Sequence, residues 1–181
     1  MAYLIDHSNS ADYVSEYIDV YSTYESSNRY DYIKALIPLQ AIKIGTIKIF
    51  PIPVEHGKTE NNAFVFLDKD SCIFFGTDFS LMTQNVSNFK FDKVYIECNY
   101  DDDKLKEILS SENDELREKH IRQVSTHMSK ENCKTHLRYM NLSKCKEIVL
   151  LHASAFLINK IYTKIEFEKE FKIKTNFAKE N

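Results

Sequence analysis

The sequence predicts a layered α/β or α+β fold that forms a single domain over residues 1–181. Three observations support this. Short apolar runs, typical of buried strands, alternate along the chain with longer stretches of helical periodicity. The composition is globular, with 43% hydrophobic and 13% aromatic residues. The length suits one domain of about 100–200 residues, and no internal repeat or proline-rich linker divides it.

The first half of the chain is predicted to contain short strands and two hairpins. An apolar run at residues 3–5 is followed by helical spacing at 11–19, a short strand at 19–23 and a helix near 26–36. Residues 41–54 alternate apolar and polar side chains around Gly45, as a hairpin does. A second hairpin is predicted from residues 63–67 and 72–75.

The second half is predicted to be richer in helix. Buried-type strands are expected at residues 94–96 and 148–151. Between them lie three helical stretches, at about 101–111, 114–124 and 129–140. The last stretch, about 160–174, has the pattern of a helix that ends in a strand, and its charges are typical of a solvated face.

Composition excludes several classes of protein. With 24 Lys and Arg against 27 Asp and Glu, the net charge of -3 argues against a protein that coats polyanions. Three glycines cannot form a Gly-rich phosphate loop. The chain shows neither a signal peptide nor an apolar run of about 20 residues, so we expect a cytoplasmic protein with no membrane partner. The four scattered cysteines are predicted to be buried free thiols.

Polar residues that directly follow apolar strands are the strongest functional signal. His56, Asp78, Glu97 and His152 stand at predicted strand ends, and His127 precedes a predicted helix. Ligands of layered α/β folds bind beyond strand ends, and imidazole with carboxylate is the ligand set of zinc, manganese or iron. A single such residue is more often a hydrogen-bonded structural residue or a helix cap. The occurrence of all five residues at such positions indicates a metal centre.

Five blocks of the sequence carry a resemblance to a known family. They are PVEHG at 53–57, FGTD at 75–78, YIECNY at 95–100, STHMS at 125–129 and LLHAS at 150–154. In order and spacing they resemble the later motifs of the metallo-β-lactamase fold, and most of all its phosphodiesterase branch, which includes ribonuclease Z. The resemblance covers about residues 3–155 and implies an αββα sandwich.

The resemblance also implies roles for individual residues. His56, Asp78 and His152 match metal ligands, with Asp78 in the position that bridges two metals. Glu97 and His127 match a pair in which the Glu polarises the His, and the His protonates the leaving oxygen. Asp78, Glu97 and His127 would thus form the catalytic group, and the cofactor would be one or two zinc or manganese ions.

The sequence departs from the family in two places. The hallmark HxHxDH corresponds to HSNSAD at residues 7–12, where only His7 matches and Asp12 is a substitute ligand. By family logic, His7, His56 and Asp78 would hold a first metal, and Asp78, His152 and Asp12 would hold a second. Because the second set depends on Asp12 as a substitute ligand, a single metal is more plausible than a dinuclear centre. Only six residues precede His7, so the sandwich would lack its leading N-terminal strands. The exposed sheet edge then predicts a homo-oligomer.

Two main functional hypotheses follow from these residues. The first is a metal-dependent phosphodiesterase that acts on a nucleotide or a nucleic-acid phosphodiester. The second is a catalytically inactive relative that binds a nucleotide or a protein partner, and a purely structural domain is a third reading. Nucleic-acid binding by Arg117, Lys119, Arg122 and Lys130 has weak support, because acidic residues interleave with them and favour a solvated helix face. His120 and His136 are predicted to lie on the surface.

Overall fold

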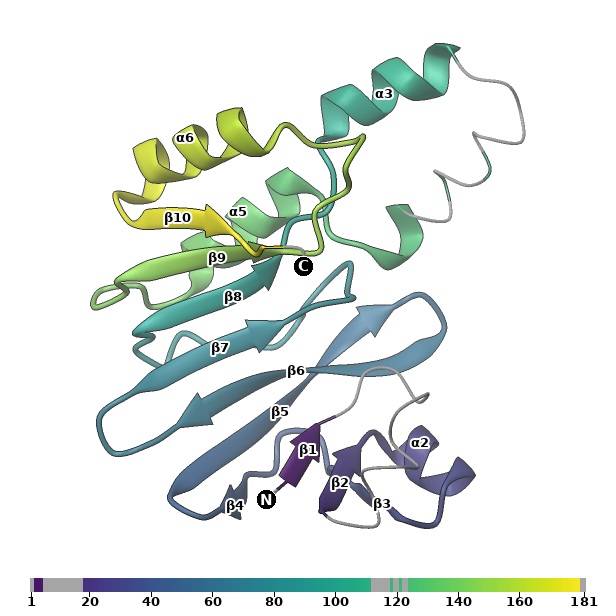
Figure 1. Ribbon diagram of the computed structural model, residues 1–181, viewed down its shortest axis with the longest axis vertical. Helices are drawn as coiled ribbons and strands as arrows, with labels where there is room; N and C mark the ends of the chain where they lie inside the picture. Colours follow the sequence, from purple (N-terminus) through teal and green to yellow (C-terminus); the bar gives the residue numbers. More distant parts are fainter. Residues whose placement is uncertain (1, 5–17, 112–117, 119–120, 122–123, 180–181) are drawn as a thin grey trace.

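The computed structural model describes residues 2–4, 18–111, 118, 121 and 124–179, which form two sheets and the helices around them (Figure 1). The small parallel sheet has the order β1-β2-β3, and the large sheet has the order β10-β9-β8-β7-β6-β5-β4. The small sheet comprises β1 (Ala2–Leu4), β2 (Asp19–Ser22) and β3 (Ile33–Ala35). The large sheet comprises β4 (Ile42–Ile44), β5 (Ile47–His56), β6 (Thr59–Leu67), β7 (Cys72–Gly76), β8 (Lys93–Glu97), β9 (Glu147–Leu151) and β10 (Lys174–Phe177). The helices are α2 (Tyr24–Arg29), α3 (Asp102–Ser111), α5 (Lys130–Tyr139) and α6 (Lys160–Phe171).

The large sheet is antiparallel in one half and parallel in the other. Strands β4 to β7 pair antiparallel in sequence order, whereas β7, β8, β9 and β10 pair parallel. Because β5 and β7 are both antiparallel to β6, β5 runs in the same direction as β7, β8 and β9. The carboxyl ends of these four strands therefore lie along one edge of the sheet.

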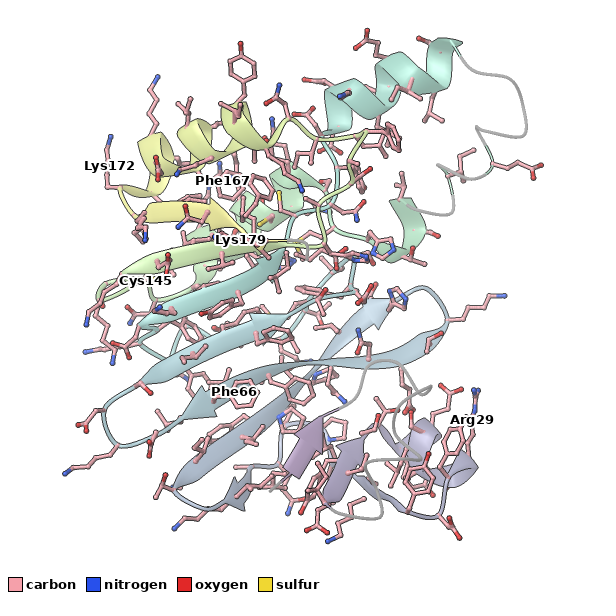
Figure 2. The ribbon with its side chains drawn as sticks, in the orientation of Figure 1. Arg29, Phe66, Cys145, Phe167, Lys172 and Lys179 are labelled. Atoms are coloured by element: carbon pink, nitrogen blue, oxygen red, sulfur yellow. The ribbon has the colours of Figure 1, made fainter. Side chains whose placement is uncertain are left out.

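The main core lies between the parallel half of the large sheet and helices α5 and α6. Cys133 and Leu137 of α5 are fully buried against strand residues of this core. So is Phe167 of α6, which is labelled in Figure 2. The spacing of Cys133 and Leu137 places both on one face of α5. This helix begins where the Ser129 hydroxyl accepts a hydrogen bond from the backbone N–H of Asn132.

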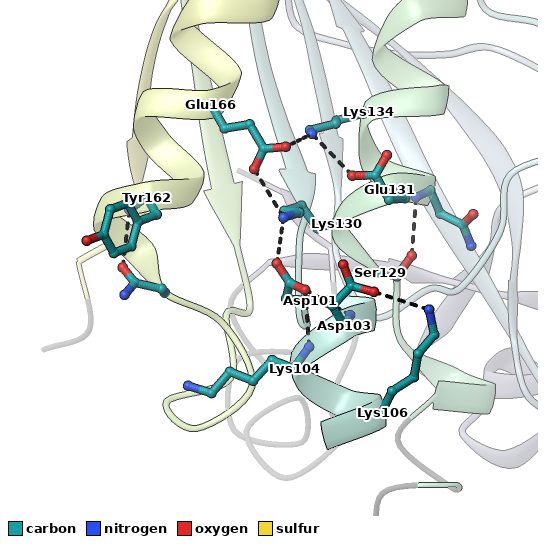
Figure 3. A network of polar contacts seen from close by, with 12 residues as sticks. Asp101, Asp103, Lys104, Lys106, Ser129, Lys130, Glu131, Lys134, Tyr162 and Glu166 are labelled. Carbon is teal, nitrogen blue, oxygen red and sulfur yellow. Dashed lines mark hydrogen bonds and ion pairs between the residues drawn. The ribbon is translucent and has the colours of Figure 1, made fainter. Parts of the chain in front are cut away.

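An ionic network ties α5 to α3 and α6 (Figure 3). The Lys130 ammonium lies 2.5 Å from an Asp101 carboxylate oxygen and 3.1 Å from a Glu166 carboxylate oxygen, and Lys134 pairs with Glu131 and Glu166. Burial alone would lower the pKa of Lys130, but its ion pairs with Asp101 and Glu166 outweigh burial and raise it. Lys130 is therefore a structural cation of this network and not part of a phosphate-binding surface.

Most predicted elements are confirmed. Both hairpins, the strands at 94–96 and 148–151, and the terminal helix with its strand are present. Cys72, Cys98, Cys133 and Cys145 are free thiols, of which the first three are buried. Within the described part of the chain, no helix combines the length and the apolar character that crossing a membrane requires.

Two predictions are wrong, and others cannot be compared. The helix predicted near 26–36 ends at Arg29, because Ile33–Ala35 pairs with β2 and buries Ile33. His136 is not a surface residue, since only 8% of it is exposed. Most of the helix predicted at 11–19, most of that at 114–124, and His120 lie outside the described residues.

Candidate active site

The carboxyl edge of the large sheet brings together the predicted strand-end residues. Asp78 follows the end of β7, Glu97 is the last residue of β8, and His152 follows the end of β9. These three strands are direct neighbours, about 4.8 Å apart in a sheet, so the three side chains meet. His56 ends β5 at the same edge, and His127 reaches it from the segment before α5, which forms a parallel bridge from Ser129 to Tyr100.

Glu97 is the centre of the cluster. Its side chain has no exposed surface, and its two oxygens have different partners. Oε1 lies 2.7 Å from Nδ1 of His127 and 3.5 Å from Nδ1 of His152. Oε2 accepts a hydrogen bond of 2.7 Å from the backbone N–H of Phe79. A buried carboxylate held in this way orients the histidine rings that face it.

Asp78 pairs with His152 above this buried carboxylate. Its Oδ1 lies 3.1 Å from Nδ1 of His152 and 3.9 Å from Nδ1 of His127. The hydrogen bond from His152 lowers the pKa of Asp78 to about 2. Hydrogen bonds to Asp78 and then Glu97 raise the pKa of His152 to about 10. The two groups thus stabilise each other's charged forms.

The backbone conformation of two site residues is unusual. Asp78 and His152 have φ angles of 54° and 52°, which lie in the left-handed region that residues other than glycine rarely adopt. Side-chain amides hold both residues there. The Asn61 amide donates to the backbone oxygens of Thr77 and Asp78, at 3.2 and 2.6 Å, and the Asn99 amide donates to the backbone oxygen of His152 at 2.6 Å. Such strain costs about 1–3 kcal/mol per residue and is concentrated at functional sites.

His56 lies beside the cluster, and its ring is oriented. Its Nδ1 is 2.9 Å from the backbone oxygen of Thr126, so Nδ1 donates and Nε2 is the nitrogen that can accept a hydrogen bond or bind a cation. Its ring centroid is 5.5 Å from that of His127. Gly57, with a φ of 59°, turns β5 into β6 close to Thr126. The hairpin therefore supplies His56, and the segment before α5 supplies the backbone oxygen that orients its ring.

The residues present fit a divalent cation. One ligand atom each from Asp78, His127 and His152 lies within 4.8 Å of the others, and the donor set is one carboxylate and two imidazoles. This group contains Asp78 and His152, two of the predicted ligands, together with His127, for which the sequence indicated another role. His56 is adjacent but not in the group, and the predicted ligands His7 and Asp12 lie outside the described residues.

The signal for Asn61 was available in the sequence but was missed. Asn61 and Asn62 directly precede the apolar half of β6, and asparagine is depleted in strands. Two such residues at the start of a strand that begins beside His56 indicate that their side chains make polar contacts at the site.

No protein-family model matches the sequence, and no curated protein matches it. Solved structures do match. The metallo-β-lactamase fold protein YhfI from Bacillus subtilis is 16% identical, with a TM-score of 0.71 over 99% of this chain and 75% of that chain. A diphosphatase of the PhnP family is 16% identical, with a TM-score of 0.62 over 99% of this chain and 69% of that chain. The short form of human tRNase Z is 12% identical, with a TM-score of 0.53 over 90% of this chain and 55% of that chain. The chain has the metallo-β-lactamase fold.

Proposed function

We propose that the protein is a metal-dependent hydrolase that cleaves a phosphodiester bond in a nucleotide or a nucleic acid. The observation that carries the proposal is the convergence of Asp78, His127 and His152 around the buried carboxylate of Glu97. Two proteins of similar fold add support, because one is described as a diphosphatase and the other as a tRNase Z.

Asp78 and His152 are the residues that would hold the cation, with Nε2 of His56 and the predicted ligands His7 and Asp12 as further donors. Zinc and manganese suit these nitrogen and oxygen ligands. When bound, such an ion supplies Lewis acidity that neutralises charge on phosphoryl oxygens and makes water nucleophilic near neutral pH.

His127 is the proposed proton donor to the leaving oxygen. Its Nδ1 is bonded to Glu97, which leaves Nε2 as the nitrogen that can carry a proton to the substrate. Glu97 is itself fixed by the N–H of Phe79, so the ring has one preferred orientation. His127 and Glu97 therefore form a positioned acid and its orienting group.

The test is turnover of bis(p-nitrophenyl) phosphate in excess manganese or zinc. We expect activity that a chelator abolishes, a fall in kcat of about 10²–10⁴-fold in His127→Gln, and loss of activity in Asp78→Asn. Asp70→Asn is the matched control, because Asp70 is an exposed aspartate in the β6–β7 turn. Turnover that survives the chelator, or that neither site variant reduces, would contradict the proposal. A folded protein with no turnover in either metal would favour the inactive nucleotide-binding or protein-binding alternative.

A further inference from the structure

A cavity of about 270 Å³ lies beside β5 and the start of β6, on the antiparallel side of the large sheet. It exists because β4 pairs only with residues 47–49 of β5. Beyond that point, the segment after β3 lies along β5, where the backbone N–H of Leu39 donates to the oxygen of Pro51, and α2 contacts β6 through the backbone N–H of Glu25, which donates to Glu60. Shorter pairing thus leaves a hollow whose walls come from β5, β6, α2 and the segment after β3.

Asn62 is the unusual residue in the wall of this cavity. Only 8% of it is exposed, yet its side-chain amide makes no hydrogen bond with any residue that the structure describes. Leaving such a buried group unpaired costs about 1–3 kcal/mol. The amide atoms are not sealed in the core, because among the described residues only Asp102 Oδ2 is both sealed and unpaired. Asn62 therefore presents its amide to the cavity.

The other walls suit a flat ring. Tyr24 has 63% of its surface exposed at the mouth, and Pro38 and Pro53 supply flat apolar surface. Aromatic and apolar side chains of this kind stack on nucleobases. The cavity is close to the lower limit of about 300 Å³ for small-molecule sites, which suits one ring system and not a whole drug-sized ligand.

The polar groups of the cavity, the Asn62 amide and the Glu60 carboxylate, indicate which ring edge it would recognise. A carboxamide presents one acceptor and one donor side by side, which matches the edge of adenine. Glu60 also lines the cavity. One of its oxygens accepts the backbone N–H of Glu25 at 3.1 Å, and its second oxygen can accept from an amino group.

We propose that this cavity binds the base of a nucleotide, and specifically a base that carries an exocyclic amino group, as adenine does. Asn61 connects the cavity to the candidate active site, because it lines the cavity while its amide donates to the backbone oxygens of Thr77 and Asp78. The assignment of this base to the substrate rests on the proposed function, and it names the substrate class as an adenine-type nucleotide.

The test measures binding without turnover. Calorimetric titrations of the full chain, stripped of metal with a chelator, compare 5′-AMP with inosine 5′-monophosphate and ribose 5-phosphate. We expect 5′-AMP to bind about tenfold tighter than ribose 5-phosphate, since stacking alone contributes a factor of this size. Inosine 5′-monophosphate should bind more weakly than 5′-AMP, because it has an oxygen in place of the amino group.

Two variants locate the binding. Tyr24→Ala changes an exposed side chain and should weaken 5′-AMP binding about tenfold, whereas Tyr139→Ala, at a 76% exposed tyrosine outside the cavity, should not weaken it. Asn62→Leu keeps roughly the side-chain size and removes the amide oxygen that would accept from the amino group, so it should reduce the preference for 5′-AMP over inosine 5′-monophosphate. Equal binding of 5′-AMP and ribose 5-phosphate, or no effect of Tyr24→Ala, would overturn the inference.

This readout separates the two proposals. If 5′-AMP binds as expected but no phosphodiester is hydrolysed, the base site stands and the hydrolase proposal fails. If bis(p-nitrophenyl) phosphate is hydrolysed but 5′-AMP binds no better than ribose 5-phosphate, the hydrolase proposal stands and the base site fails.

Discussion

The surroundings of Gly76 are closely packed beneath the candidate site. This glycine is the last residue of β7, two positions before Asp78. A Cβ atom at this position would lie 2.8 Å from Cε1 of Phe79 and 3.0 Å from Cβ of Ala63. Phe79 is fully buried and its N–H binds Glu97, so it has little room to move. The small residue is therefore required by packing, and the sequence alone could not distinguish this from a turn requirement.

We expect Gly76→Ala to lower the free energy of unfolding by about 1–3 kcal/mol, the usual cost of overpacking. It should also disturb the segment that carries Asp78 and thus weaken metal binding. Urea denaturation and manganese titration measure the two effects. Gly45→Ala is the control, since no atom lies within 4 Å of its added Cβ. It should cost only the strain of its positive φ and leave metal affinity unchanged. Equal metal affinity in Gly76→Ala and the unmodified protein would contradict the prediction.

At the scale of single elements, the strand ends could be predicted and the pairing partners could not. Short apolar runs stop at Glu97 and just before His152, so a local pattern was enough to place them. Ile33–Ala35 is a strand only because β2 lies beside it, and that is a long-range fact. His136 was misjudged for the same reason. It stands among charged residues, yet neighbouring elements cover it, and burial lowers its pKa.

Strand β9 is tied to both of its neighbours through Glu147. One carboxylate oxygen lies 3.0 Å from the Lys93 ammonium of β8, and the other lies 3.0 Å from the Lys174 ammonium of β10. The hydrogen bonds from Lys174, Lys93 and Asn176, in that order, lower the pKa of Glu147 to about 2 from its ordinary value of 4.5. Because the folded-state pKa is the lower one, the carboxylate stabilises the fold at any pH above about 4.5. This contribution is lost as the pH falls through about 2.

We therefore expect Glu147→Gln to lower the urea midpoint at about pH 6 and to have a much smaller effect near pH 2, where about half of the native carboxylates are protonated. Urea titrations across this range, on both proteins, measure the difference. Glu107→Gln is the control, because Glu107 is an exposed glutamate on α3 whose charge should matter little at either pH. A difference between Glu147→Gln and the unmodified protein that is equally large at both pH values would show that the ion pairs are not its cause.

For the whole molecule, the change from antiparallel to parallel pairing at β7 decides where chemistry can occur. The antiparallel half supplies His56, Asn61 and the proposed base cavity. The parallel half supplies Glu97 and His152, and the segment before α5 supplies His127. A nucleotide with its base in the first half and its phosphate at the second would bind across this change. The homo-oligomer and the cytoplasmic location expected from the sequence remain predictions.

A cation held by Asp78 and His152 should stabilise the whole fold, because the unfolded chain does not hold these two ligands together. At a free metal concentration of 100 times Kd, the linkage gain is about 2.7 kcal/mol. For a chain of this length, that corresponds to a rise in Tm of about 5–10 °C. Calorimetry of the chelated protein, with and without added manganese, measures the rise. Asp78→Asn should abolish it and Asp70→Asn should retain it, because Asp70 lies in an exposed turn. An equal rise in Asp78→Asn would place the stabilising ion elsewhere on the molecule.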